Sequence, residues 1–360
     1  MKDSRSSGKQ LQMLGPSLGF VAWHELAVTP SFVEPARRSP GRFVSVVVRS
    51  FGRPEALKEL IERLQTQSCP AFEAVILEQS NDRALLQYIE KLGDARLRVV
   101  QSPPLNPAAA RNEAIRHTRG DILLFIDDDD LPLGNDWIES HLRNYEDASC
   151  MGVVGRLLRD PGSPAPPSFP RFVRFMAMRH TFFKDSRALA HNTLRKRGID
   201  FLLGSNSSVR CALLDRIGGW DEGIPINEEQ SFAIKFHRNK KAGEHLVFDP
   251  APGIWRRTDV PGGLNRRFGR DWYLRELDAW LFYFRHIVAH YFPWRYRLLY
   301  PFFVLRALQK VTFWIWDVDN AHHPFRERVV ATLKLVTQLP GTLANSRYPA
   351  AAVRRVPQWV

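Results

Sequence analysis

Short apolar runs and amphipathic segments alternate along residues 43–126. The run "FVSVVV" at 43–48 is short, β-branched and bounded by turn residues, which is typical of a fully buried strand. Pro54 suits the first turn of a helix, and apolar residues follow it at helical spacing. The pattern then predicts strands at 74–77, 97–100 and 122–126, and helices near 82–92 and 107–118. Strands that alternate with helices in this way predict an α/β fold with a parallel sheet.

The alternation is lost after Cys150. Proline and glycine in "RDPGSPAPPSFP" (159–170) predict a loop, and a basic, poorly periodic stretch follows it. Helices are predicted near 211–217 and from about Glu228, with the turn "GGWDE" (218–222) between them. From about Arg270 the chain is rich in aromatics and arginine, which predicts a separate C-terminal helical region.

Four consecutive carboxylates end the strand in "DILLFIDDDD" (121–130). Side chains alternate at a strand exit, so Asp127 and Asp129 are expected on one side and Asp128 and Asp130 on the other. Adjacent carboxylates repel, so a positive partner is expected. Ligands bind at the carboxyl ends of parallel strands, and paired carboxylates suit Mg²⁺ or Mn²⁺. The alternative is a solvated acidic turn in which Asp130 or Asp136 caps a helix.

Composition bounds the class of protein. The chain has 360 residues, 44% of them hydrophobic, which excludes global disorder. Its net charge of +13 favours anionic partners: nucleic acid, phosphorylated small molecules or a membrane surface. Three scattered cysteines suggest neither a disulfide framework nor a zinc site, so a reducing cytosol is expected. Neither a signal peptide nor a membrane-spanning segment is recognised.

Three segments in order resemble a family 2 glycosyltransferase, over roughly residues 43–265. They are "SVVVRSFGRPEALKELIERLQTQSCP", "NPAAARNEAIRHTRGDILLFIDDDDLP" and "LGSNSSVRCALLDRIGGWDEGIPINEEQSFAIKF". The resemblance implies a GT-A fold, a Rossmann-like, mostly parallel sheet flanked by helices. The expected division is a flexible extension at 1–41, a catalytic domain at 42–268 and an aromatic, basic helical region at 269–360. Within the catalytic domain, 42–132 would bind the nucleotide and 133–268 the acceptor.

The resemblance also implies site residues. Asp127 and Asp129 would form the DxD motif, which holds Mn²⁺ or Mg²⁺ and the donor's ribose and diphosphate. Glu78 would bind the nucleobase. The full donor set is Ser50, Glu78, Arg111, Asn112, Asp127, Asp128, Asp129 and Arg256.

The acceptor side and the catalytic acids are implied in the same way. The acceptor set is Gly204, Ser205, Asn206, Trp220 and Asp221. A plain turn at 204–206 and a core role for Trp220 are open alternatives. In "NEEQSFAIKF", Glu229 aligns with the family's catalytic base and Glu228 with its neighbour. Alternatively, both acids simply complement the positive end of a helix dipole.

The chain departs from the family pattern at two places. Arg49, Ser50, Phe51 and Gly52 replace the usual residues after the first strand, and Glu78 replaces an Asp, so the nucleobase is not identified. Arg256 stands where many relatives have a metal-binding His. A guanidinium cannot ligate a cation but can pair with a diphosphate, so weaker metal binding is expected.

The expected activity is inverting, hexosyltransferase-type transfer from a nucleotide-diphosphate sugar, a UDP-sugar by preference. A saccharide or lipid-linked acceptor in bacterial envelope synthesis is expected by analogy. The C-terminal region suits contact with an anionic membrane at the inner face of the cytoplasmic membrane, or packing within the protein or a dimer. The alternatives are a DxD phosphatase, and a basic nucleic-acid- or membrane-binding protein without catalysis.

Overall fold

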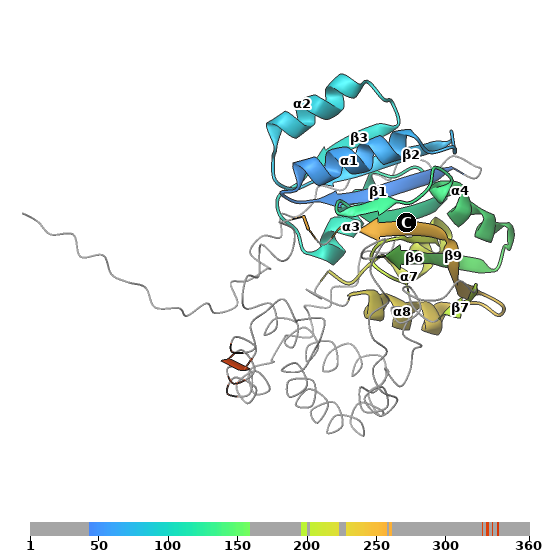
Figure 1. Ribbon diagram of the computed structural model, residues 1–360. Helices are drawn as coiled ribbons and strands as arrows, with labels where there is room; N and C mark the ends of the chain where they lie inside the picture. Colours follow the sequence, from blue (N-terminus) through green and yellow to red (C-terminus); the bar gives the residue numbers. More distant parts are fainter. Residues whose placement is uncertain are drawn as a thin grey trace, which may run out of the picture. The chain divides into compact units, whose positions relative to one another are not determined.

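A mixed β-sheet flanked by helices organises the part of the chain that the structure describes (Figure 1). This computed structural model describes residues 43–158, 196–199, 202–222, 228–257 and 259–260, and five residues between 326 and 337. All of them belong to the compact unit Pro35–Val360. The predicted N-terminal extension, the loop at 159–170 and nearly all of the predicted C-terminal region lie outside the described residues.

The first half of the sheet is the predicted series of βα units. Its elements are β1 (Val44–Ser50), α1 (Pro54–Gln65), β2 (Phe72–Glu78), α2 (Arg83–Leu92), β3 (Leu97–Gln101), α3 (Pro107–Arg116) and β4 (Ile122–Asp127). The four strands are parallel, in the order β3-β2-β1-β4. Local signals set the helix ends: the Asp82 carboxylate accepts from Leu85 N at 3.1 Å at the start of α2, and Gly93 ends that helix with a φ of 60°.

The second half of the sheet is mixed, so antiparallel strands extend the predicted parallel series beyond β4. Its elements are β5 (Asp130–Pro132), α4 (Trp137–Leu142), the 3₁₀ helix η1 (Arg143–Glu146), β6 (Cys150–Leu158), β7 (Arg197–Ile199), β8 (Ser207–Arg210), α7 (Cys211–Ile217), α8 (Glu228–Asn239) and β9 (His245–Arg256). The order continues from β4 as β8-β6-β9-β5, and β7 also pairs with β9. β8 runs antiparallel to both β4 and β6. In the first half, a crossover helix connects each parallel strand to the next. No helix lies between β4 and β5, which are joined by a two-residue turn.

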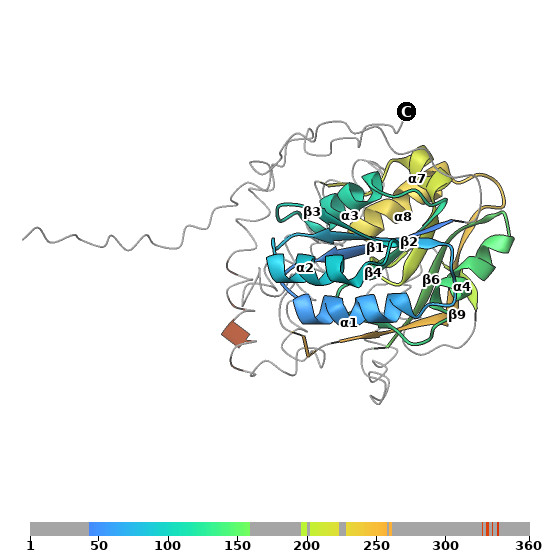
Figure 2. The ribbon, with the colours of Figure 1, turned by 90° about the horizontal axis from the view of Figure 1, so that it is seen from above.

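Helices cover both faces of the sheet. α1 and α2 lie on one face, and α3, α7 and α8 lie on the other (Figure 2). The strands β1, β2 and β4 are therefore buried on both sides, which explains their continuous apolar runs. Since α1 and β1 belong to one βα unit, their link leaves the carboxyl edge of the sheet, where β4 also ends. Among the described residues, no helix has the length and apolar character needed to cross a bilayer.

A buried polar hub ties α4 to the sheet. The Asn206 side-chain oxygen accepts from Trp137 Nε1 at 2.8 Å and lies 3.1 Å from His141 Nε2. Trp137 Nε1 can only donate, which fixes the orientation of the amide and makes His141 Nε2 a donor too. The other ring nitrogen of His141 lies 3.0 Å from Ser208 Oγ. Burial lowers the pKa of His141 to about 4, although the bond to Asn206 opposes this shift.

His141 should make the fold sensitive to acid. Between about pH 6.5 and pH 4 the unfolded chain binds a proton that the folded chain does not, so stability falls as the pH is lowered through this window. The loss should reach on the order of 3 kcal/mol at the low end. Urea unfolding of the wild type and of His141→Gln at pH 7 and pH 4.5 checks this. The variant should show a smaller loss, and equal losses in the two proteins would contradict the prediction.

Candidate active site

Strand pairing gathers the aspartates and two arginines at the carboxyl end of β4. The parallel register of β1 and β4 places Arg49 beside Asp127. The antiparallel register of β5 and β9 places Arg256 opposite Asp130. Carboxylate oxygens of Asp127, Asp129 and Asp130 lie within 4.8 Å of one another, and these three residues are called the acid cluster below.

The predicted alternation of the four aspartates is correct only in part. Asp127 and Asp129 do lie together. Asp130 joins them instead of sharing the other side with Asp128, because β4 ends at Asp127 and residues 128–129 form a turn. The alternative role of Asp130 as a helix cap is excluded because Asp130 begins β5. Asp136 does precede α4, but its carboxylate bonds Ser140 and Arg143 rather than a backbone N–H.

Three arginines already meet the four carboxylates. Arg49 pairs with Asp127. Arg53 Nη1 lies 3.0 Å from Asp128 and 2.8 Å from Asp129. Arg256 pairs with Asp130 at 2.7 Å and reaches Asp127 at 3.5 Å. The protein itself therefore supplies positive partners for the carboxylates, a role that the resemblance gives to a metal ion and a nucleotide.

The carboxyl groups differ in the direction of their pKa shifts, since the pKa is lowered for Asp127 and raised for Asp128 and Asp129. Burial acts to raise the pKa of Asp127, but Arg49 and Arg256 outweigh it and hold that pKa below its usual value. Burial, together with the charges of Asp130 and Asp127, raises the pKa of Asp129 to about 7. Burial also raises the pKa of Asp128. Near neutral pH, Asp129 thus gains a proton more easily than Asp127 does.

The acid cluster fits a hard divalent cation. It offers oxygen ligands from three residues at one strand end, which Mg²⁺ and Mn²⁺ prefer. The side chains of Asp127 and Asp129 are 23% and 16% exposed, so a cation can reach them from solvent. Asp130 has no exposed side-chain surface, and its carboxylate is already bonded by Arg256 and Ser205. Asp127 and Asp129 are therefore the better placed ligands.

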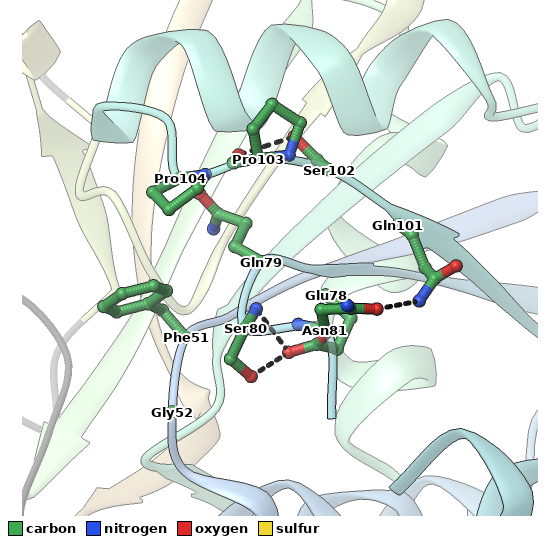
Figure 3. A pocket seen from close by; sticks show the side chains of 10 residues that line it. All are labelled: Phe51, Gly52, Glu78, Gln79, Ser80, Asn81, Gln101, Ser102, Pro103 and Pro104. Atoms are coloured by element: carbon green, nitrogen blue, oxygen red, sulfur yellow. Dashed lines mark hydrogen bonds between the residues drawn. The ribbon is translucent and has the colours of Figure 1, made fainter. Parts of the chain in front are cut away.

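A pocket of about 790 Å³ lies at the ends of β1, β2 and β3, beside the loop that follows β1. It is lined by Phe51, Gly52, Glu78, Gln79, Ser80, Asn81, Gln101, Ser102, Pro103 and Pro104 (Figure 3). The backbone N–H of Phe51 donates to Asp128 at 3.2 Å, so the loop after β1 links the pocket to the aspartates. An aromatic ring, two prolines and several amides suit a flat polar ligand.

Two predicted donor residues lie at this pocket edge. Glu78 lines the pocket, but its carboxylate already accepts from the backbone N–H groups of Ser80 and Asn81, each at 2.8 Å, and from the Ser80 hydroxyl. It therefore shapes the turn that forms the wall. Ser50 pairs with Glu78 across the sheet, and its buried Oγ has no hydrogen-bond partner among the described residues.

Arg111 and Asn112, two further predicted donor residues, are not among the residues that line this pocket. Arg111 is buried, pairs with Glu228 and donates to the Gly204 carbonyl at 3.1 Å. Asn112 is fully buried and exchanges two hydrogen bonds with the Trp220 backbone, at 2.8 and 2.9 Å. Both residues sit in the first turns of α3, whose side chains pack against α8 and the turn at 218–222.

The two candidate catalytic acids differ in their surroundings. Glu228 is buried and held by Arg111. Glu229 is partly exposed in the first turn of α8. A methyl group placed on Gly204 would lie 2.9 Å from Glu229 Oε1, so this carboxylate adjoins the 204–206 turn. The 204–206 turn also contacts the acid cluster, because the backbone N–H of Asp127 donates to Ser205 Oγ at 3.1 Å.

The five predicted acceptor residues are all buried. Trp220 stacks on Phe232 with ring centroids 4.7 Å apart, which favours the core alternative over stacking on a sugar. Asn206 uses its amide in the hub described above and adopts a φ of 51°, in keeping with the turn alternative. Asp221 accepts from Lys235 at 3.0 Å and from Ser231. Gly204 and Ser205 are the two that adjoin the acids.

Sequence reasoning did not assign Arg49 and Arg53 a role in the site. A signal was present, because both flank the end of β1, and β1 and β4 were predicted as parallel strands of one sheet. Aligning their ends places basic residues next to the aspartates. The role of Arg111 as a partner of Glu228 had no such signal, since the two are 117 positions apart.

Comparisons with known proteins agree with the fold and the motifs. TuaG of Bacillus subtilis (strain 168), a proposed teichuronic acid biosynthesis glycosyltransferase, is 32% identical over 111 residues, which are 30% of this chain and 43% of TuaG. The mannosyltransferase PcManGT from Pyrobaculum calidifontis, solved with GDP-Man and Mn²⁺, is 17% identical and gives a TM-score of 0.50 over 90% of this chain and 88% of its own. S. aureus TarS 1–349 is 16% identical, with a TM-score of 0.49 over 84% and 88% of the two chains.

The family model described as "Glycosyl transferase family 2" matches residues 45–218. This segment contains nearly all of β1, all of β2, β3 and β4, the four aspartates at 127–130 and the 204–206 turn. The fold around it is the mixed α/β arrangement of GT-A proteins. Over this segment, which is just under half of the chain, the sequence is similar to glycosyltransferase family 2.

Proposed function

We propose that this protein is an inverting glycosyltransferase that moves a sugar from a nucleotide-diphosphate sugar to an acceptor hydroxyl. The observation that carries the proposal is the convergence of Asp127, Asp129 and three arginines beside a pocket at the carboxyl edge of the sheet. Carboxylates for a cation and guanidiniums for phosphates together suit an anionic nucleotide. The acid cluster ends the fourth strand, which argues against the phosphatase alternative, where such a motif ends the first.

The donor would be divided between the pocket and the acid cluster. The base would enter the pocket beside Phe51, whose polar lining includes the side chains of Asn81, Gln101 and Ser102. The ribose and diphosphate would extend toward Asp127 and Asp129. A divalent cation bound by these two carboxylates would supply charge to neutralise the diphosphate as it leaves. Arg256 and Arg49 stand beside the same place.

Glu229 is the proposed catalytic base. Its carboxylate would accept the proton of the acceptor hydroxyl as that oxygen forms a bond to the anomeric carbon, and the bond from that carbon to the diphosphate oxygen breaks with its electron pair. Attack from the side opposite the leaving group inverts the anomeric centre. Glu228 is buried against Arg111, whereas Glu229 is more exposed and is therefore the acid that an acceptor can reach more easily.

The proposed setting is the synthesis of an envelope polysaccharide or glycolipid in a bacterium. The likeness to TuaG supports this setting, although the aligned part spans less than half of that relative. A UDP-sugar is the preferred donor, and the acceptor is a saccharide or a lipid-linked saccharide. Action in the cytoplasm, with peripheral contact at the inner face of the membrane, fits the +13 net charge.

A binding panel tests the proposed donor class. Calorimetry with UDP, GDP, CDP and ADP, each with Mn²⁺ and again with EDTA, should give binding for one base above the others. Addition of the corresponding nucleotide sugars should compete at the same site. Binding of none of the four nucleotides would overturn the proposal.

Gly204 should be intolerant of a side chain. A methyl group there would overlap Arg111 Nη2 and crowd Glu229, and Arg111 cannot move without releasing Glu228. We expect Gly204→Ala to lower sugar transfer by about 10-fold or more, since a displaced base loses its alignment. Gly198→Ala is the matched control, because its nearest neighbour would lie 4.0 Å away. Full transfer activity in Gly204→Ala would contradict the proposed placement of the acids.

A further inference from the structure

Arg256 is held in a fixed position beside the acid cluster. Its Nε and Nη2 atoms donate to the two oxygens of Asp130 at 2.8 and 2.7 Å, which is a bidentate pair. The pair is built into the sheet, because Asp130 on β5 and Arg256 on β9 are directly opposite in the antiparallel register. Asp130 also accepts from Ser205 and has no exposed side-chain surface. Asp130 therefore acts as an anchor for the guanidinium.

The anchored guanidinium faces the proposed cation ligands. Its Nη2 lies 3.5 Å from Asp127 Oδ2, the oxygen of Asp127 that Arg49 does not bond. A divalent cation held by Asp127 and Asp129 would approach the same oxygen against this positive charge. Two cationic groups would then compete for one carboxylate.

Arg256 also has a group to offer a ligand. The side chain is 32% exposed, and its Nη1 donates no hydrogen bond to any residue that the structure describes. A guanidinium with two nitrogens fixed by a carboxylate, and with the third unbonded among the described residues, is pre-organised for a phosphate oxygen. Asp130 therefore binds two nitrogens of Arg256, and the Nη1 group remains as a hydrogen-bond donor next to the acid cluster.

We propose that Arg256, anchored by Asp130, binds the donor diphosphate directly and takes over part of the cation's role at the acid cluster. The inference rests on the proposed function, because it needs a diphosphate at this site. It has two consequences. Arg256 weakens the binding of a divalent cation to the nucleotide-free protein, and it allows the nucleotide to bind with only a partial need for metal.

The first experiment measures Mn²⁺ binding without nucleotide, by the loss of the electron paramagnetic resonance signal of free Mn²⁺. Arg256→Ala should bind Mn²⁺ about tenfold or more tightly than the wild type, because a competing charge is gone. Arg257→Ala removes the same charge from the next residue, whose side chain pairs with Glu59 and Asp259, and should stay near wild type. Adding Asp129→Asn to Arg256→Ala should abolish the gain, which places the ion at the acid cluster.

The second experiment measures the affinity for UDP and GDP in EDTA and in excess Mn²⁺. Arg256→Ala should lose about tenfold or more in EDTA for the nucleotide that binds, and less in Mn²⁺, because the cation then supplies the missing charge. Arg256→Gln keeps a hydrogen bond to Asp130 and should show the same pattern if Arg256→Ala folds poorly. Thermal unfolding confirms that each variant is folded.

The outcomes separate this inference from the proposed function. Equal Mn²⁺ affinity in the wild type and Arg256→Ala, or an equal loss of nucleotide affinity in EDTA and in Mn²⁺, would overturn the role of Arg256 even if the wild type binds a nucleotide. If the wild type binds neither nucleotide, the proposed function fails, while the Mn²⁺ measurement still decides whether Arg256 competes for the acid cluster.

Discussion

Replacing Glu229 with glutamine is expected to reduce sugar transfer by about 10²-fold or more, because the amide cannot accept the proton of the acceptor hydroxyl. Glutamine keeps the size and polarity of the side chain at the start of α8. The acid cluster and the pocket do not include Glu229, so the affinities for nucleotide and Mn²⁺ should stay near wild type. Single-turnover transfer and calorimetry on the same preparation measure the two effects.

Glu228→Gln is the matched control for this experiment. It removes the charge that Arg111 pairs with in a buried position, so stability should fall more than for Glu229→Gln. Activity measured at a temperature where both variants are folded should still be lower in Glu229→Gln. A Glu229→Gln enzyme with wild-type turnover, beside an inactive and well-folded Glu228→Gln, would show that Glu228 is the base instead.

Replacing Asp129 with alanine is expected to remove the part of nucleotide binding that depends on Mn²⁺. The loss should be on the order of 10²-fold in affinity, because one of the two proposed ligands is gone. The fold should survive, since the side chain is 16% exposed and Arg53 keeps its contact with Asp128. Calorimetric titration with nucleotide, in Mn²⁺ and again with a chelator, measures the affinity that depends on Mn²⁺.

Asp136→Ala controls for the removal of a carboxylate from the same stretch of chain. Among the described residues, the Asp136 carboxylate bonds Ser140 and Arg143, and its side chain is 61% exposed. Its removal should leave nucleotide affinity unchanged. If Asp129→Ala behaves in the same way, both with and without chelator, the assignment of the DxD motif is refuted.

The first half of the fold could be predicted because its signals are local. Continuous apolar runs mark β1, β2 and β4, and the predicted helices at 82–92 and 107–118 match α2 and α3 closely. The second half could not, because its strands are set by pairing between distant segments. β5 has three residues and exists through its pairing with β9, more than 120 positions away along the chain.

In the site, too, the residues marked by local signals could be predicted, and those positioned by distant pairing could not. The aspartates were found because they are consecutive and follow a recognisable strand. Arg49 and Arg53 were not found, because they reach the aspartates only through strand register and turn geometry. Arg256 was placed at the site by resemblance, but its pairing with Asp130 follows from the register of β5 and β9. Asn206 and Trp220 were placed on the acceptor side by resemblance, whereas side-chain packing puts both in the interior. Composition and spacing carry no signal for that difference.

The most direct measurement is the release of nucleoside diphosphate from a panel of nucleotide sugars by the full chain, with Mn²⁺ present. The panel comprises UDP-glucose, UDP-GlcNAc, UDP-galactose and GDP-mannose, and Asp129→Ala and Glu229→Gln are run in parallel. We predict that the wild type releases the diphosphate from one of these donors faster than either variant does. Release at the same rate by all three proteins, or the absence of release together with the absence of nucleotide binding, would contradict a nucleotide-sugar transferase site at the carboxyl end of β4.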